Sequence, residues 1–175
     1  RILDKEFRIS ITSGKIQESV ERMADQMNKD LQDKNVIFLG ILNGAFMFVS
    51  DLIRRIKFGC EVSFLKLATY EGSHSTGSVK RLIGLDEDIL NKTVVVLEDV
   101  IDTGFTIENI LKQLTGYEPA QIKVATLFFK PGRFSKEKLP DYIGIEIPDD
   151  FIVGYGLDYK GIGRNLKDNY ALTDY

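Results

Sequence analysis

The stretch that most constrains the fold is residues 94–106, which read VVVLEDVIDTGFT. The apolar residues at its start are typical of a strand buried on both faces, as in a parallel sheet. Three carboxylates, those of Glu98, Asp99 and Asp102, follow, and a threonine–glycine turn leads into helical spacing. Because an unpaired charge is costly to bury, this pattern indicates a strand whose end opens onto a ligand site.

Apolar periodicity predicts the elements around this strand, which we expect over 93–97. Helices are expected over 16–31, with Ser13 as the cap, and over 45–56 and 106–114. Further strands are expected over 36–42, 62–67, 79–85, 122–129, 142–147 and 151–155, with a mobile loop over 70–78. Apolar strands followed by helices predict an α/β fold with a central, mostly parallel sheet flanked by helices.

The totals fit a single domain and exclude several classes of function. The chain has 175 residues, with 23 basic against 26 acidic side chains, so a general nucleic-acid or membrane-surface binder is disfavoured. The single cysteine, Cys60, excludes an intrachain disulfide and a cysteine zinc cluster, which favours a cytoplasmic protein. The single histidine, His74, excludes a mechanism that needs several histidines.

The turn DTGFT, residues 102–106, has two interpretations. The first amides of a helix have no partner within the helix and favour an anion, so the loop can enclose a phosphate without a lysine. Thr103 and Thr106 would add hydroxyl donors, and Gly104 would allow the tight turn. The alternative is that Asp102 is only the helix cap.

Glu98 and Asp99 make a ligand site the better interpretation. Acidic side chains at this point can accept hydrogen bonds from vicinal hydroxyls or attract a hydrated Mg²⁺. A solvated acidic strand end is the weaker alternative, and a Mg²⁺-dependent phosphatase that uses Asp99 and Asp102 is another. No G-x-x-x-x-G-K-[ST] motif occurs, and the Gly161–Gly163 pair lacks the third glycine of a dinucleotide-binding turn.

Other polar residues are expected at the same edge of the sheet. Asn43 and Gly44 follow one predicted strand, and Lys130 follows another. Ligands of open α/β sheets bind outside the carboxyl ends of the strands, so these residues are expected to converge with 98–106.

VVVLEDVIDTGFT resembles the phosphoribosyl-pyrophosphate-binding signature of the type I phosphoribosyltransferases. Four more segments resemble the hypoxanthine–guanine branch of that family, in order along the chain: LNGAFMFVSDL (42–52), TYEGSHSTG (69–77), VATLFFKP (124–131) and IPDDFIVGYGLDYKGIGRNL (147–166). The resemblance implies one domain over 1–175, with a core over about 36–135. A small hood subdomain would comprise the N-terminal residues and about 140–175.

The resemblance also implies a reaction and a set of roles. Ribose 5-phosphate would pass from phosphoribosyl pyrophosphate to hypoxanthine, and to guanine as well, in purine salvage. Residues 102–106, including Phe105, would hold the 5-phosphate, and Asp102 would also take the proton from the purine. Glu98 and Asp99 would contact the ribose hydroxyls, with Mg²⁺ nearby.

Further roles carry over position by position. Lys130 would bind the 6-oxo oxygen, Phe151 would stack on the purine, and Ile152 and Val100 would complete the purine site. Asn43, Gly44 and Arg164 would bind pyrophosphate, Asp158 would hold a second Mg²⁺, and Thr69 and Tyr70 would close over the site.

Two positions depart from the family pattern, because many relatives have lysine in place of Asn43, and lysine or another polar residue in place of Phe105. The role of Arg133 stays open, as does the isomer of the Leu42–Asn43 peptide bond.

Each role has a structural alternative. Lys130 can be a surface lysine, Phe151 a core residue, and Asp158 and Arg164 a surface ion pair. A regulatory protein that senses phosphoribosyl pyrophosphate is the alternative function, although the purine lysine and the closing loop both argue for an enzyme. We expect a homodimer or homotetramer that acts on small molecules and binds neither nucleic acid nor membrane.

Overall fold

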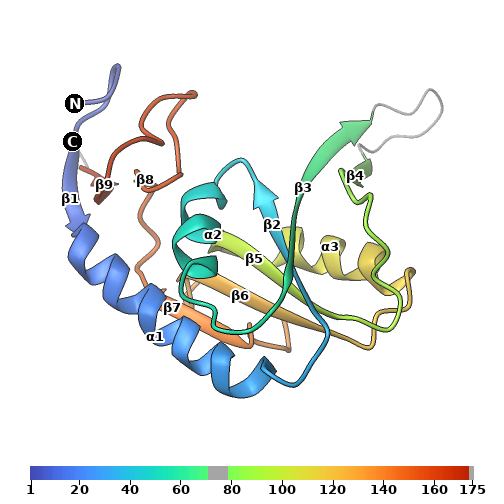
Figure 1. Ribbon diagram of the computed structural model, residues 1–175. Helices are drawn as coiled ribbons and strands as arrows, with labels where there is room; N and C mark the ends of the chain where they lie inside the picture. Colours follow the sequence, from blue (N-terminus) through green and yellow to red (C-terminus); the bar gives the residue numbers. More distant parts are fainter. Residues whose placement is uncertain (71–78, 174–175) are drawn as a thin grey trace.

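The computed structural model describes residues 1–70 and 79–173, and its larger sheet has six strands (Figure 1). These strands are β2 (Val36–Leu42), β3 (Glu61–Tyr70), β4 (Val79–Ile83), β5 (Thr93–Ile101), β6 (Gln121–Phe129) and β7 (Tyr142–Glu146). Their order is β4-β3-β2-β5-β6-β7. All neighbouring pairs are parallel except β3 with β4, so the prediction of a mostly parallel central sheet is confirmed.

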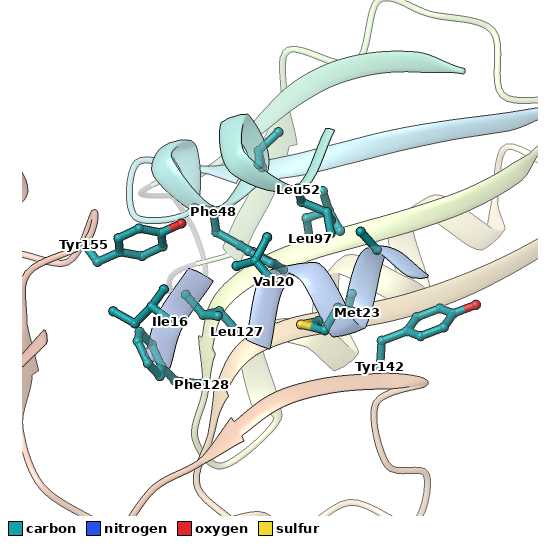
Figure 2. Packing of buried hydrophobic residues seen from close by; sticks show 14 of the residues in the cluster. Ile16, Val20, Met23, Phe48, Leu52, Leu97, Leu127, Phe128, Tyr142 and Tyr155 are labelled. Carbon is teal, nitrogen blue, oxygen red and sulfur yellow. The ribbon is translucent and has the colours of Figure 1, made fainter. Parts of the chain in front are cut away.

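Helices cover both faces of this sheet. On one face, α1 (Ser13–Leu31) and α2 (Phe46–Ile53) enclose a core with alternate residues of β2, β5 and β6. Ile16, Val20 and Met23 of α1 lie in this core beside Phe48 of α2 (Figure 2). On the other face, α3 (Phe105–Thr115) packs on the intervening strand residues. Because both faces are covered, the central strands are apolar throughout, as the sequence predicted.

Two local predictions were wrong. Strand β5 continues to Ile101 instead of ending at Leu97, because its pairing with β6 extends through Glu98 and Val100. The cap of α1 is Thr12, whose hydroxyl accepts a hydrogen bond from Lys15 N, and not Ser13. The amide of Ser13 instead donates to Asp168 Oδ1 at 2.6 Å.

A second sheet joins the two ends of the chain. It consists of β1 (Phe7–Ile11), β9 (Asn169–Leu172) and β8 (Ile152–Val153), in the order β1-β9-β8 (Figure 1). The sequence did not predict β1 or β9, and the strand expected over 151–155 is only two residues long. Among the described residues, no helix is long and apolar enough to span a membrane.

Candidate active site

The carboxyl ends of β2, β5 and β6 meet at one edge of the sheet, where the sequence placed the site. Leu42–Asn43, at the end of β2, is a cis peptide bond. Gly44 follows and lies directly against the carboxylate of Asp99, so that a Cβ at position 44 would collide with Asp99 Oδ2. This contact explains why the loop after β2 requires glycine at this position.

A cavity of about 230 Å³ lies at the end of β5. It is bounded by the last residues of the strand and by the start of α3, and Val100 is among them. The lining residues are Glu98, Asp99, Val100, Ile101, Asp102, Thr103, Gly104, Thr106 and Ile107. The cavity is therefore polar on one side and lies against a helix N-terminus on the other.

The start of α3 has the geometry of an anion site. Its N-terminal flanking residue is Gly104, with φ at 89°, which has no side chain to cap the helix. The alternative that Asp102 serves as the helix cap is therefore wrong. The amide of Phe105 donates a hydrogen bond of 3.4 Å to Thr103 Oγ1, and the dipole of α3 with the other amides of its first turn favours an anion in the cavity.

Phe105 is 64% exposed, so its side chain does not form the floor of this loop. The ammonium of Lys136 lies 3.8 Å from the centre of the Phe105 ring and 2.8 Å from Glu108 Oε2. Lys136 and Phe134 also pack over Gly104. A lysine from outside the motif thus lies beside the position where many relatives carry one.

Asp102 lies between two cations. Arg133 Nε is 2.8 Å from Asp102 Oδ1, a buried oxygen that accepts no hydrogen bond from the described residues. Lys130 Nζ is 3.6 Å from the other oxygen, Oδ2. Asp149 contacts both cations, at 3.7 Å from Lys130 Nζ and 3.1 Å from Arg133 Nη1. Lys130 is not a surface lysine, because only 8% of it is exposed.

Glu98 and Asp99 have little compensation for their charge. Burial, together with the neighbouring charge of Asp99, raises the pKa of Glu98 well above its usual value. Burial also raises the pKa of Asp99 to about 6, although hydrogen bonds from backbone amides and the charge of Arg164 oppose this shift. Such a pair is suited to binding a cation or hydroxyl donors.

Asp158 and Arg164 form an ion pair of 2.7 Å, with side chains that are 28% and 30% exposed. Asp158 Oδ2 also accepts a hydrogen bond of 2.6 Å from Gly161 N. The charges of both residues act on Asp99, which places this pair at the same site. The predicted surface pair is thus partly buried, and its charges act on Asp99, which lines the cavity.

The residues predicted to bind the purine come from two segments, the end of β6 and the start of β8. Ile152 is buried in β8, while Phe151 is 46% exposed and lies in an aromatic cluster with Phe7 and Tyr159. The Asp149–Lys130 contact connects this segment to the end of β6. Phe151 is therefore not a core residue.

Thr69 and Tyr70 are the last residues of β3, where their backbones pair with Lys80 and Val79. The rest of the predicted loop, residues 71–78, lies outside the described part of the chain.

Sequence reasoning missed several residues near the site. Asp149 gave no signal beyond its place in the IPDD segment, and Phe7 belongs to a strand that was not predicted. Arg133 was noticed without a role. Its position three residues after Lys130, in a turn where its amide donates to the Lys130 carbonyl, is what brings both cations to Asp102.

Comparisons with known proteins agree with this geometry. Residues 11–160 match the family model described as the phosphoribosyl transferase domain. The chain therefore belongs to the phosphoribosyltransferase family.

Its relatives within that family narrow the resemblance. It is 38% identical to a hypoxanthine-guanine phosphoribosyltransferase of Staphylococcus aureus, over 90% of this chain and 89% of the relative. It is 36% identical to a hypoxanthine phosphoribosyltransferase of Haemophilus influenzae, over 90% of each.

Solved structures of similar proteins have the same fold. A hypoxanthine phosphoribosyltransferase from Staphylococcus aureus superposes with a TM-score of 0.87 at 35% identity, covering 97% of this chain and 92% of that one. A hypoxanthine-guanine phosphoribosyltransferase from Bacillus anthracis, which holds a HEPES molecule in its active site, superposes with a TM-score of 0.88 at 32% identity, covering 96% and 100%.

Proposed function

We propose that this protein is a purine salvage enzyme. It transfers ribose 5-phosphate from 5-phosphoribosyl 1-pyrophosphate to hypoxanthine, and to guanine, giving IMP or GMP and pyrophosphate. The observation that carries the proposal is the juxtaposition of Asp102 and Lys130, 3.6 Å apart, beside the uncapped N-terminus of α3. The N-terminus of α3, which can bind a phosphate, therefore lies next to Asp102 and Lys130, which can exchange a proton and a hydrogen bond with a purine.

The 5-phosphate binds at residues 102–106. The backbone of Asp102, Thr103, Gly104, Phe105 and Thr106 wraps the anion, and the threonine hydroxyls donate to it. The exposed ring of Phe105 supports this role, because the backbone amide and not the side chain makes the contact. Glu98 and Asp99 accept hydrogen bonds from the ribose hydroxyls, which suits two carboxylates with little charge compensation.

The purine binds between the end of β6 and the segment before β8. Lys130 donates to the 6-oxo oxygen and so rejects adenine, whose 6-amino group offers no comparable acceptor. Phe151 stacks on the ring, and its exposed face supports that role. Ile152 offers backbone groups to the exocyclic position, and Val100 closes the apolar side.

Pyrophosphate binds between the loop after β2 and the Asp158–Arg164 segment. Asn43 and Gly44 offer backbone donors, and the guanidinium of Arg164 adds a bidentate contact. Thr69 and Tyr70, at the end of β3, close over the site and exclude water.

The carboxylates of this site fit Mg²⁺. Glu98 and Asp99 offer oxygen ligands on the ribose side, and Asp158 offers them on the pyrophosphate side. Mg²⁺ in such sites is usually held by one or two carboxylates and completed by phosphates and water. When bound, Mg²⁺ neutralises the charge that develops on the leaving pyrophosphate.

The residues of the chain then act on the two reacting centres. As the bond between the anomeric carbon and pyrophosphate breaks, Arg164 stabilises the departing negative charge. The purine nitrogen forms the new bond to that carbon, and its proton passes to Asp102 Oδ2, the oxygen that faces Lys130. Closure over Thr69 and Tyr70 keeps water from the electron-poor sugar, so no enzyme nucleophile is needed.

We further propose that the whole chain is one catalytic domain, in which the N-terminal residues and about 140–175 form the hood over a core of about 36–135. The three-stranded sheet that joins both chain ends supports a hood of this kind, but β7 (Tyr142–Glu146) pairs with β6 and belongs to the core sheet, so the hood begins after β7 and not at about 140. We also propose a cytoplasmic homodimer or homotetramer that binds small molecules and neither nucleic acid nor membrane. Exposed Phe46, Val62 and Phe64, on α2 and β3, are suited to subunit contact.

One assay tests the proposed activity. The purified protein is incubated with phosphoribosyl pyrophosphate, Mg²⁺ and each of hypoxanthine, guanine, xanthine and adenine, and nucleotide formation is followed by absorbance. We expect product with hypoxanthine and guanine and none with adenine. If no 6-oxopurine yields nucleotide while the protein still binds phosphoribosyl pyrophosphate, the regulatory alternative replaces the enzyme.

A further inference from the structure

The turn after β8 has an unusual backbone. Gly154, Tyr155 and Gly156 all have positive φ, at 100°, 50° and 99°. This conformation is easy for glycine and uncommon for a tyrosine. Tyr155 is nevertheless only 3% exposed, so the surrounding structure holds its side chain in the interior.

The hydroxyl of Tyr155 is anchored to both helices on this face of the sheet. It donates a hydrogen bond of 2.6 Å to Asp51 Oδ2, on α2. Gln17 Nε2, on α1, donates to the same oxygen at 2.7 Å, and Arg55 Nη2 donates to Gln17 Oε1 at 2.9 Å. Figure 2 shows the ring extending from the C-terminal segment toward α2, beside Phe48. The turn is therefore tied to the helix that follows the Asn43–Gly44 loop.

The same turn holds Arg164. The carbonyl of Gly156 accepts a hydrogen bond of 2.7 Å from Arg164 Nη1, and the amide of Gly156 donates to the Arg164 carbonyl at 3.0 Å. Gly156 also lies so close to Gly44 that a Cβ at position 156 would collide with the Gly44 carbonyl oxygen. The position of this turn therefore sets the separation between Gly44 and Arg164.

We propose that the Tyr155–Asp51 hydrogen bond is a positioning device for pyrophosphate recognition. It holds the turn 154–156 on α2, so that Gly44 and Arg164 face each other across the pyrophosphate. Neither Tyr155 nor Asp51 contacts substrate in this scheme, so both are positioning residues and not catalytic ones. The inference rests on the proposed function, which assigns Gly44 and Arg164 to pyrophosphate.

Two single-atom changes test this device. Tyr155→Phe removes the hydroxyl that reaches Asp51, and Tyr142→Phe is the matched control. Tyr142 is also buried, at 2% exposure, and its hydroxyl donates to Asp30 Oδ2 on α1 at 3.0 Å. The two tyrosines lie toward opposite ends of the buried cluster around α1 (Figure 2). Both variants therefore lose one tyrosine–aspartate hydrogen bond, but only one of them lies at the turn.

Calorimetric titration with Mg²⁺–pyrophosphate and with IMP supplies the readout. We expect Tyr155→Phe to weaken pyrophosphate binding roughly 10- to 150-fold, the range for one lost hydrogen bond to a charged group, and to change IMP binding less than about 2-fold. IMP occupies the phosphate and purine sites without pyrophosphate, so it reports on general damage. Tyr142→Phe should leave both affinities unchanged, even if it lowers the melting temperature as much as Tyr155→Phe does.

Other results would overturn the inference. If Tyr155→Phe weakens the binding of pyrophosphate and of IMP equally, its role is a general structural one. The same conclusion would follow if Tyr155→Phe and Tyr142→Phe had equal effects on pyrophosphate binding. If Tyr155→Phe does not fold, Asp51→Asn is the second variant. It retains an acceptor oxygen, so it should weaken pyrophosphate binding selectively, but by less than the factor expected for Tyr155→Phe. A wild-type protein that binds neither ligand would overturn the proposed function itself, whereas normal wild-type binding with an unselective variant overturns only the positioning role.

Discussion

Arg133 Nε lies 2.8 Å from Asp102 Oδ1, while Lys130 Nζ lies 3.6 Å from Asp102 Oδ2. The two oxygens of one carboxylate therefore face different cations. Oδ1, the oxygen beside Arg133, is buried. We propose that Arg133 thereby orients Asp102, so that Oδ2 takes the proton of the purine in the proposed reaction.

Replacing Arg133 by glutamine should lower kcat by about 10- to 100-fold, because Asp102 Oδ1 loses its charged partner and the carboxylate is then less well oriented. Steady-state kinetics with hypoxanthine and phosphoribosyl pyrophosphate measure this effect. Lys138→Gln is a suitable control, since the side chain of Lys138 is 74% exposed and its ammonium lies 3.9 Å from the carboxylate of Asp141. An unchanged kcat in Arg133→Gln would mean that Arg133 does not orient Asp102.

Asp102→Asn should separate chemistry from binding. The variant retains the backbone that wraps the 5-phosphate but loses the proton acceptor, so kcat should fall by about 10²- to 10⁴-fold while the dissociation constant of phosphoribosyl pyrophosphate changes little. Single-turnover kinetics and equilibrium titration measure the two quantities. A parallel loss of both would assign Asp102 a purely structural role.

Gly44→Ala should disrupt the site without disturbing the core. The new Cβ would collide with Asp99 Oδ2 and displace that carboxylate, so we expect the affinity for phosphoribosyl pyrophosphate to fall at least about 10-fold. The control is Gly59→Ala, because a Cβ at position 59 meets nothing within 4 Å. The proposed place of Asp99 is wrong if both variants bind the donor as the wild type does.

The raised pKa of Asp99 should make the stability of the protein depend on pH. Its pKa in the folded protein, about 6, exceeds the value of 3.8 expected without the fold, so the folded state binds more protons between these values. The contribution that protonated Asp99 makes to the free energy of unfolding is fully present below pH 4, and it is lost as the pH rises to 6 and above. Asp99→Asn removes the titrating group, so the variant should gain roughly 1–3 kcal/mol relative to the wild type between pH 4 and pH 7.

Urea denaturation in EDTA at several pH values measures that difference. Asp33→Asn, in the exposed turn after α1, controls for the loss of one acidic side chain. A difference between Asp99→Asn and the wild type that stays constant from pH 4 to pH 7 would contradict the prediction.

The same raised pKa has a consequence for function. Asp99→Asn removes the free-energy cost of keeping a charged carboxylate away from water, so it should stabilise the free protein. The same substitution removes a ligand for the ribose hydroxyls and Mg²⁺. A gain in stability with a loss of donor affinity would identify Asp99 as a group retained for binding and not for folding.

Local pattern was enough to determine the central sheet and much of the site. Apolar runs such as that of β5 form strands wherever both faces can be covered, and the carboxylates and glycine that follow mark the strand end that faces a ligand. Helix α1 followed from the spacing of Ile16, Val20, Met23, Met27 and Leu31, all of which are buried. These features depend on residues close together in the chain.

Only the tertiary structure decided how distant segments meet. Strand β1 pairs with β9 across almost the whole chain. The sequence of β1, FRISI, does alternate apolar and polar residues, but this alternation does not indicate which strand will be its partner. Asp149 reaches Arg133, Tyr155 reaches Asp51, and Gly156 lies on Gly44. Such contacts leave no periodic signal, because each depends on the packing of two elements and not on the order of residues within one. The sequence by itself therefore determined where the candidate site lies, and the packing of the C-terminal segment on α2 determined how that site is completed.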